Sequence, residues 1–183
     1  MKFHLSRNST LNTLLSRVSD SGDPEDLAPM YYVHTSSGRK TSYIYKIAPD
    51  AAGKFKGRKD LSEEELKDQE EIARIHWHRH ISSTLVYNGR RVDFNDYMPS
   101  KGVLQLTRSF KGPDGHTYEW HTGYTTPYLV RLDENSKPSA RIVDFQQDNK
   151  FTGVKHAYLE IHPEGEHMLH QQFRTIKFSL RQA

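Results

Sequence analysis

The sequence contains no cysteine, so disulfide bridges, thiolate metal sites and cysteine nucleophiles are all excluded. It also lacks long apolar runs, and therefore shows neither a signal peptide nor a segment that could span a membrane. Neither charge dominates, because 26 basic and 23 acidic residues give a net charge of only +3, which does not indicate a nucleic-acid partner. We therefore expect a cytoplasmic protein with no transmembrane segment that does not bind nucleic acid.

The chain is long enough, at 183 residues, to bury a stable core without covalent cross-links such as disulfide bonds. Hydrophobic residues make up only 34% of it, but aromatic residues, each of which buries a large area, supply 11%. No repeat or domain boundary is visible, so we predict a single β domain over residues 1–183 with a linker-like insertion at about 48–70. Within the insertion, Ser62 and Glu65 have the spacing of a capping box, which predicts a short surface helix.

Apolar and polar side chains alternate over residues 71–80, which is the pattern of a half-buried strand. The apolar side of this strand consists of Ala73, Ile75 and Trp77. The polar side consists of Arg74 and three histidines, His76, His78 and His80. The segment leads to Asn88-Gly89, a pair that tolerates positive φ and predicts a tight hairpin turn.

Further turn signals divide the rest of the chain into short strands. A glycine within 36–40 and a Pro-Asp-Gly sequence within 111–115 each separate two strand-like segments. Strands do not alternate with long helical patterns, as they would in a parallel α/β sheet. The fold class we predict is mainly β, a single antiparallel barrel with one short surface helix. Residues 169–180 fit one face of a C-terminal helix, although the end of this segment alternates equally well as a strand, so periodicity leaves both open.

Four short stretches share turn and strand residues with a known family. They are Ala73-Arg74-Ile75 with Trp77-His78, the segment 87–97 around Asn88-Gly89, the segment 109–120 with its Gly-Pro-Asp-Gly turn, and the segment 159–165. In these motifs, from about residue 10 to residue 180, the chain resembles a widespread fungal domain of unknown function, family 6593. That family in turn resembles the tubby-like and scramblase-like β-barrels, in which antiparallel strands enclose a C-terminal helix. The resemblance therefore implies a tubby-like barrel with a helical C-terminus, and it implies no activity.

The histidine row is the strongest candidate for chemistry. Side chains at i and i+2 of a strand project the same way, roughly 6–7 Å apart, and two such histidines can share a metal when a third ligand comes from elsewhere. We predict that His76, His78 and His121 form such a site for zinc, copper or iron, where a bound water would become acidic enough for hydrolytic or lyase chemistry. Arg74 in the same row favours the simpler alternative, a merely polar strand face. Other possible third ligands are Glu119 and Asp96.

Tyr118 and Trp120 share one face of a strand, where they either belong to the core or, together with Trp77, line a ligand cavity. Because no catalytic set converges, we expect a small cytosolic β-barrel that binds or scaffolds a lipid, a hydrophobic small molecule or a protein partner. The alternative is a histidine-based, possibly metal-dependent enzyme acting on a small molecule, and the sequence leaves open whether the protein is an enzyme. A third possibility is an acid-responsive surface, because protonation of the 11 histidines would add positive charge.

Overall fold

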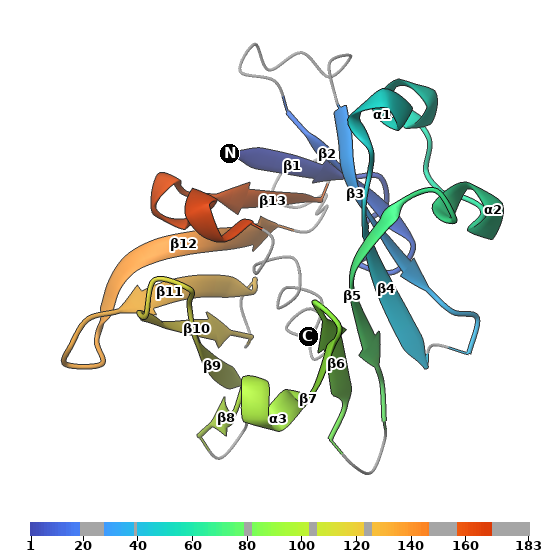
Figure 1. Cartoon of the computed structure of the whole chain (residues 1–183). Helices are drawn as coiled ribbons and strands as arrows, with labels where there is room; N and C mark the ends of the chain where they lie inside the picture. Colours follow the sequence, from blue (N-terminus) through green and yellow to red (C-terminus); the bar gives the residue numbers. More distant parts are fainter. Residues whose placement is uncertain are drawn as a thin grey trace.

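One strongly curved antiparallel sheet forms the centre of the structure, a computed structural model (Figure 1). The residues that it describes are 1–18, 28–38, 40–78, 82–102, 106–122, 126–146 and 157–169. The sheet has 13 strands in the order β7-β6-β5-β4-β3-β2-β1-β13-β12-β11-β10-β9-β8. Strands adjacent in the chain are therefore adjacent in the sheet, except for β7 and β8, which lie at its two ends. β1 joins the two halves by pairing with β13.

The strands and helices are short. The strands are β1 (Lys2–Leu5), β2 (Thr13–Arg17), β3 (Ala28–Thr35), β4 (Thr41–Lys46), β5 (Glu70–His76), β6 (Thr84–Tyr87), β7 (Arg90–Asp93), β8 (Ser100–Lys101), β9 (Thr107–Lys111), β10 (Thr117–His121), β11 (Tyr128–Leu132), β12 (Pro138–Gln146) and β13 (Tyr158–Ile161). The helices are α1 (Pro49–Phe55), α2 (Glu63–Leu66), α3 (Phe94–Tyr97) and the 3₁₀ helix η2 (Pro163–Met168). None of the helices described has the length and apolar character needed to cross a membrane.

The mainly β, antiparallel prediction is confirmed, but closure into a barrel is not. β7 and β8 are the two ends of the sheet, and in the part of the chain described no ladder joins them. α3 connects these two edges (Figure 1). Its Tyr97 ring lies 5.6 Å from that of Tyr87 on β6 and 6.5 Å from that of Phe110 on β9. Arg108 Nη1 on β9 also donates to Asn95 Oδ1 at 3.1 Å and to the Met98 carbonyl at 2.7 Å, so side-chain contacts rather than a backbone ladder bridge the gap. Of the predicted C-terminal helix, residues 170–180 lie outside the described residues.

The alternation predicted for residues 71–80 is present where β5 forms. Ala73 and Ile75 are buried, while Arg74 and His76 are partly exposed. The strand ends at His76, so only part of the predicted row lies on it. His80 lies outside the residues described.

The predicted turns are also present. Asn88 and Gly89 have φ values of 47° and 69°, and Tyr87 pairs with Arg90 on either side of them. Positive φ at both central positions is the geometry that lets a two-residue turn follow the twist of its strands. On either side of the other two predicted turns the strands are paired, β3 with β4 and β9 with β10.

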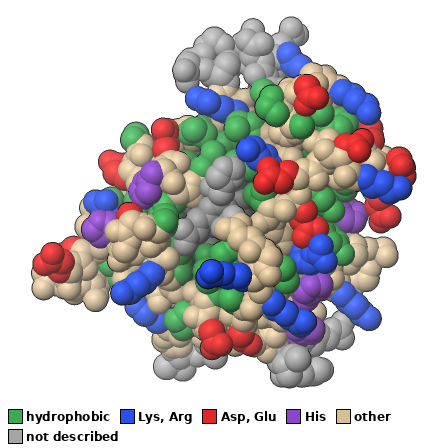
Figure 2. Space-filling view, in the orientation of Figure 1, with side chains coloured by type: hydrophobic (Ala, Val, Ile, Leu, Met, Phe, Trp, Pro, Cys, Tyr) green, Lys and Arg blue, Asp and Glu red, His purple; other side chains and the backbone are tan. Residues whose placement is uncertain are grey.

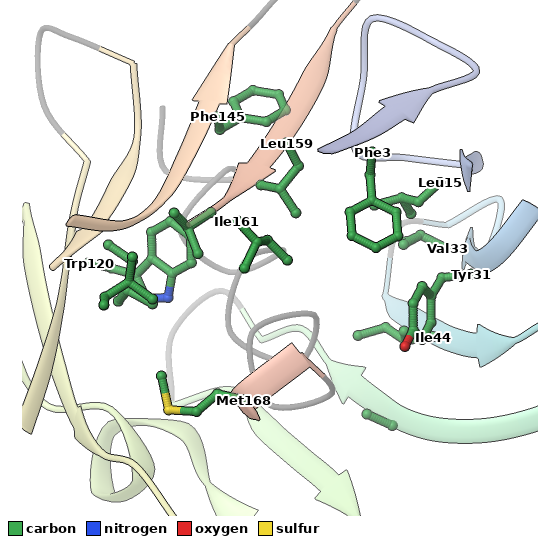
Figure 3. Packing of buried hydrophobic residues seen from close by; sticks show 14 of the residues in the cluster. Phe3, Leu15, Tyr31, Val33, Ile44, Trp120, Phe145, Leu159, Ile161 and Met168 are labelled. Atoms are coloured by element: carbon green, nitrogen blue, oxygen red, sulfur yellow. The ribbon is translucent and has the colours of Figure 1, made fainter. Parts of the chain in front are cut away.

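The main core lies between the two halves of the sheet. Side chains such as Trp120 and Ile161 from one half and Tyr31 and Ile44 from the other point toward one another there (Figure 3). Fully burying a side chain of this size contributes about 1.5–3 kcal/mol. These residues account for the curvature, because both halves must turn their apolar faces inward.

A second, smaller core lies on the outer side of β2 and β3, beneath the insertion. It consists of Leu14, Tyr32, Ile47, Phe55, Leu61 and Leu66. α2 begins with the predicted capping box, in which Ser62 Oγ accepts the Glu65 N–H at 3.3 Å and the Glu65 carboxylate accepts the Ser62 N–H at 2.9 Å. The insertion at 48–70 is therefore packed onto the sheet through α1 and α2.

Candidate functional site

The structure does not bring the three predicted metal ligands together. His76 ends β5 and His78 follows it, whereas His121 lies on β10 in the other half of the sheet (Figure 1). Within the described ranges, no group of three or more His, Cys, Asp or Glu side chains is placed to hold a metal ion. Burial and the positive charge of Arg74 lower the pKa of His76. Burial also lowers the pKa of His121, although Glu119 acts in the opposite direction.

His121 instead belongs to a chain of paired side chains on the outer face of β10–β12. Its ring stacks on Tyr128 with centroids 4.8 Å apart, and the Arg141 guanidinium lies 3.6 Å from the centroid of the same tyrosine. Arg141 Nε donates to Asp144 at 2.8 Å, and His162 Nε2 lies 2.9 Å from the other oxygen of that carboxylate. Burial alone would raise the pKa of Asp144, but the contacts with Arg141 and His162 outweigh it and lower the pKa. Asp144 is thus paired with both Arg141 and His162, whereas His121 Nε2 is buried without a hydrogen-bond partner among the described residues.

The predicted ligand-binding residues Trp77, Tyr118 and Trp120 all contribute to the main core. Tyr118 and Trp120 are 0% exposed, and Trp77 packs against the same cluster. The Tyr118 hydroxyl donates to Asp114 at 2.7 Å, and Trp77 Nε1 donates to Ser42 Oγ at 2.8 Å. The structure thus places these side chains where they stabilise the fold and satisfies their polar atoms internally.

A different row of aromatic side chains lies on the outer face of the sheet. The register places His34 opposite Tyr43 and Tyr43 opposite Arg74. Ring centroids are 5.9 Å apart from His34 to Tyr43 and 6.2 Å apart from Tyr43 to Tyr45, with planes inclined by 31° and 22°. These side chains are half-buried or partly exposed. We call His34, Tyr43, Tyr45 and Arg74 the tyrosine strip.

Arg74 is fixed in one position at the end of the tyrosine strip. Its Nε and Nη2 donate to the two carboxylate oxygens of Glu71 at 2.7 and 2.8 Å, and these hydrogen bonds raise the pKa of Arg74. The guanidinium carbon lies 5.3 Å from the Tyr43 centroid. A bidentate ion pair orients the planar cation beside the ring, so the strip carries its positive charge at a defined position next to Tyr43.

A hollow of about 510 Å³ adjoins the tyrosine strip, and His34 lies on its wall. One wall is the loop between β1 and β2, and another is the segment before α2. Arg7 from the loop and Asp60 from the segment form an ion pair across the two walls, and Ser6 Oγ donates to the Lys59 carbonyl at 3.0 Å. The polar wall residues also include Ser9, Ser36 and Ser37.

Asn12 holds the loop wall of this hollow in place. It has a φ of 50°, a conformation that asparagine tolerates better than most residues. Its side-chain oxygen accepts the Thr35 N–H at 2.7 Å, which ties the loop to the end of β3. The hollow is therefore held in shape by contacts of its own walls.

Comparison with known proteins gives one family. A family model described as "Family of unknown function (DUF6593)" matches residues 8–171. No curated protein and no solved structure matches the chain. The matched range includes both the tyrosine strip and the His121 network.

Proposed function

Because the chain belongs to the Family of unknown function (DUF6593), a name that assigns no activity, we propose from its own geometry that it is a binding module for a protein partner. The partner lies across the tyrosine strip and places a side chain in the hollow beside it. The observation that carries this proposal is the ordered row of His34, Tyr43 and Tyr45 beside the ion-paired Arg74 on an outer sheet face.

The composition of this surface suits protein recognition. Tyrosine and arginine are enriched among the residues that dominate binding energy at protein interfaces. Tyrosine supplies a large contact area while losing few rotatable bonds, and serine and asparagine supply adaptable hydrogen bonds around it. The tyrosine strip provides the tyrosine and arginine side chains. The wall of the hollow provides the serine and asparagine side chains, namely Ser9, Asn12, Ser36 and Ser37.

The shape of the surface favours a protein over a lipid or a hydrophobic small molecule. The tyrosine strip crosses β3, β4 and β5, whose neighbours lie about 4.8 Å apart, so it offers a broad face. An apolar ligand would instead favour a mostly apolar pocket that encloses it, whereas this hollow carries an ion pair and hydroxyl groups on its walls. Basic and acidic side chains are interspersed on the one face of the molecule that Figure 2 shows. At the strip itself Arg74 is paired with Glu71, and beside it Arg7 is paired with Asp60, which does not favour a polyanionic partner.

The proposal includes a barrel-like architecture and action in the cytosol. The curvature of the sheet and the position of α3 between its edges support a relationship with the tubby-like and scramblase-like barrels (Figure 1). A chain without cysteine needs no oxidising compartment to fold.

Peptide selection against two matched tyrosine variants tests the binding surface. A displayed library of random peptides is selected on the wild-type chain, and the affinities of the enriched peptides are then measured on Tyr43→Ser and on Tyr158→Ser. Tyr158 is the matched control because it is half-buried on β13 with a cation, Lys2 Nζ, 3.6 Å from its centroid.

We expect Tyr43→Ser to weaken the selected peptides at least about 10-fold, as loss of an interface anchor does, and Tyr158→Ser to leave them unchanged. Arg74→Gln should weaken the same peptides. Peptides that depend on Tyr158 and ignore Tyr43 would overturn the proposed surface.

A further inference from the structure

In the part of the chain described, β7 is one end of the sheet (Figure 1). Within the described residues it pairs with β6 alone, with Val86 opposite Arg91 and Leu85 opposite Val92. Arg91 and Asp93 are exposed, and Val92 between them is partly buried against the core. The strand therefore presents its backbone edge together with two basic side chains, Arg90 and Arg91, and one acidic side chain, Asp93.

The hydrogen-bond alternation of the hairpin determines which backbone groups face this edge. In a two-residue hairpin, the pair next to the turn, Tyr87 and Arg90, exchanges both hydrogen bonds, and the following pair exchanges none. The Phe94 N–H follows the same alternation, because it donates back to the Ser83 carbonyl at 2.8 Å. The N–H and C=O groups of Arg91 and Asp93 therefore point away from β6, toward the open edge.

We propose that this edge pairs, antiparallel, with the same edge of a second copy of the chain, about a two-fold axis at Val92. Such an axis brings residue i opposite residue j and residue j opposite residue i, so Arg91 of each copy faces Asp93 of the other. The outward backbone groups of both residues then meet as hydrogen-bonded pairs. Asp93 Oδ1 caps α3 by accepting the Asn95 N–H at 2.8 Å, and Oδ2 faces the arginine across the axis.

The charge pattern selects this register. Charged side chains on an edge strand commonly prevent pairing, and two like charges would do so here. Moving the axis from Val92 to Arg91 places the two Arg91 side chains opposite each other, and moving it to Asp93 places the two aspartates opposite each other. Only the axis at Val92 pairs opposite charges, and cross-strand pairs of opposite charge are favourable while like charges are not.

The proposed contact is small. It consists of two residue pairs and the facing Val92 side chains, far less than the roughly 1,600 Å² that a stable complex buries. We therefore expect a reversible dimer with a dissociation constant on the order of 0.1–1 mM. This association is independent of the tyrosine strip, which lies on the outer face of β3–β5.

An engineered disulfide tests the register directly, because the chain contains no cysteine of its own. In the proposed dimer, the two Val92 residues form a pair without backbone hydrogen bonds, whose Cα atoms lie about 4.5 Å apart, a separation that a disulfide accepts. Val92→Cys should form a covalent dimer when 0.2–1 mM protein, about the expected dissociation constant, is oxidised with glutathione disulfide. Val86→Cys is the matched control, since it is a partly exposed valine one strand further in.

Substitution of Arg91 by proline provides a second test of the proposed edge pairing. The Arg91 N–H does not take part in the β6 ladder, so proline there removes the outward donor without breaking the hairpin. Combined with Val92→Cys, Arg91→Pro should slow dimer formation at least about 10-fold, while circular dichroism confirms that the fold is retained. Arg91→Glu should act in the same direction without a backbone change, because it places like charges opposite each other.

The expected result is rapid cross-linking of Val92→Cys and slow cross-linking of Val86→Cys and of both Arg91 double variants. Equal cross-linking of Val92→Cys and Val86→Cys would overturn the proposal. So would a Val92→Cys protein that stays monomeric at 1 mM, or one whose cross-linking rate is unchanged by both Arg91 substitutions.

Discussion

Replacing Gly112 with alanine should destabilise the protein more than the same replacement at Gly115 in the same turn. A Cβ atom at Gly112 would lie 2.5 Å from Tyr118 Cε2, 2.6 Å from Asp114 Oδ1 and 3.0 Å from Met168 Sδ. The tyrosine cannot yield easily, because it is fully buried and its hydroxyl donates to Asp114 at 2.7 Å. The added methyl group therefore has to displace the ring, the carboxylate or η2.

The expected magnitudes follow from these contacts. Overpacking a core costs about 1–3 kcal/mol, and weakening the hydrogen bond between Tyr118 and Asp114 adds about 1 kcal/mol, so Gly112→Ala should cost about 3 kcal/mol. Gly115 has a φ of 80° with nothing within 4 Å of the added atom, so its replacement costs only the left-handed conformation, about 1 kcal/mol. Gly53 in α1 also has open space, and alanine there should stabilise by about 0.5–1 kcal/mol.

Urea unfolding followed by tryptophan fluorescence measures the three variants. Their stabilities should rank Gly53→Ala above wild type, wild type above Gly115→Ala, and Gly115→Ala above Gly112→Ala. In a chain of this size, 1 kcal/mol shifts Tm by about 2–4 °C, so thermal unfolding resolves the same order. A Gly112→Ala protein as stable as Gly115→Ala would refute the packing of η2 and Tyr118 against this turn.

Three further predictions concern the insertion, the histidines and metals. Ser62→Ala should lower the free energy of unfolding by about 1 kcal/mol, measured in urea, because it removes the capping box of α2. Burial lowers the pKa of both His76 and His121 below 6.5, so below pH 6.5 the unfolded chain binds protons that the folded chain does not. Their contribution to stability should therefore fall with the pH below that value, and the double variant His76→Gln/His121→Gln should show a smaller fall in Tm between about pH 7 and 5. Chelator should leave Tm unchanged and elemental analysis should find no stoichiometric zinc, copper or iron, whereas a bound metal that is lost in His76→Ala would support the metal-site hypothesis.

Local features of this fold could be predicted from the sequence because neighbouring residues determine them. The burial of Ala73 and Ile75 follows from side-chain alternation along one strand. The turn at Asn88-Gly89 follows from the tolerance of both residues for positive φ. The helix start at Ser62 follows from a reciprocal contact across three residues. Each needs information from only a few adjacent positions.

The site could not be predicted in the same way, because it depends on which strands are adjacent and in which register. Tyr43 and Tyr45 are visible as one face of a strand, but only the pairing of β3, β4 and β5 adds His34 and Arg74 to them. The same limit applies to the predicted metal site, since the sequence does not show that β5 and β10 lie far apart in the strand order. Likewise, no short sequence pattern indicates that Asp144 contacts His162 or that His121 belongs to the same group of side chains.

Barrel closure also depends on long-range geometry. The sequence predicts many antiparallel strands, yet closing them requires the first and last strands of the order to meet. Here the connection between those strands is only six residues long, from Phe94 to Pro99, and four of the six form α3. Its Tyr97 packs against Tyr87 on β6 and Phe110 on β9, the strands next to the two edges, and no ladder joins β7 to β8 in the part of the chain described.

Site-specific photo-cross-linking in cells that naturally make the protein tests the proposed binding face most directly. A photoreactive phenylalanine analogue is placed at position 43 in one variant and at position 158 in the other, so that the two probes lie on the outer side of the same sheet but on different strands, β4 and β13. We expect a discrete protein adduct at position 43 that is lost with Arg74→Gln, and no such adduct at position 158. An adduct at position 158 alone, or none at position 43 when the variant is folded and expressed, would contradict it.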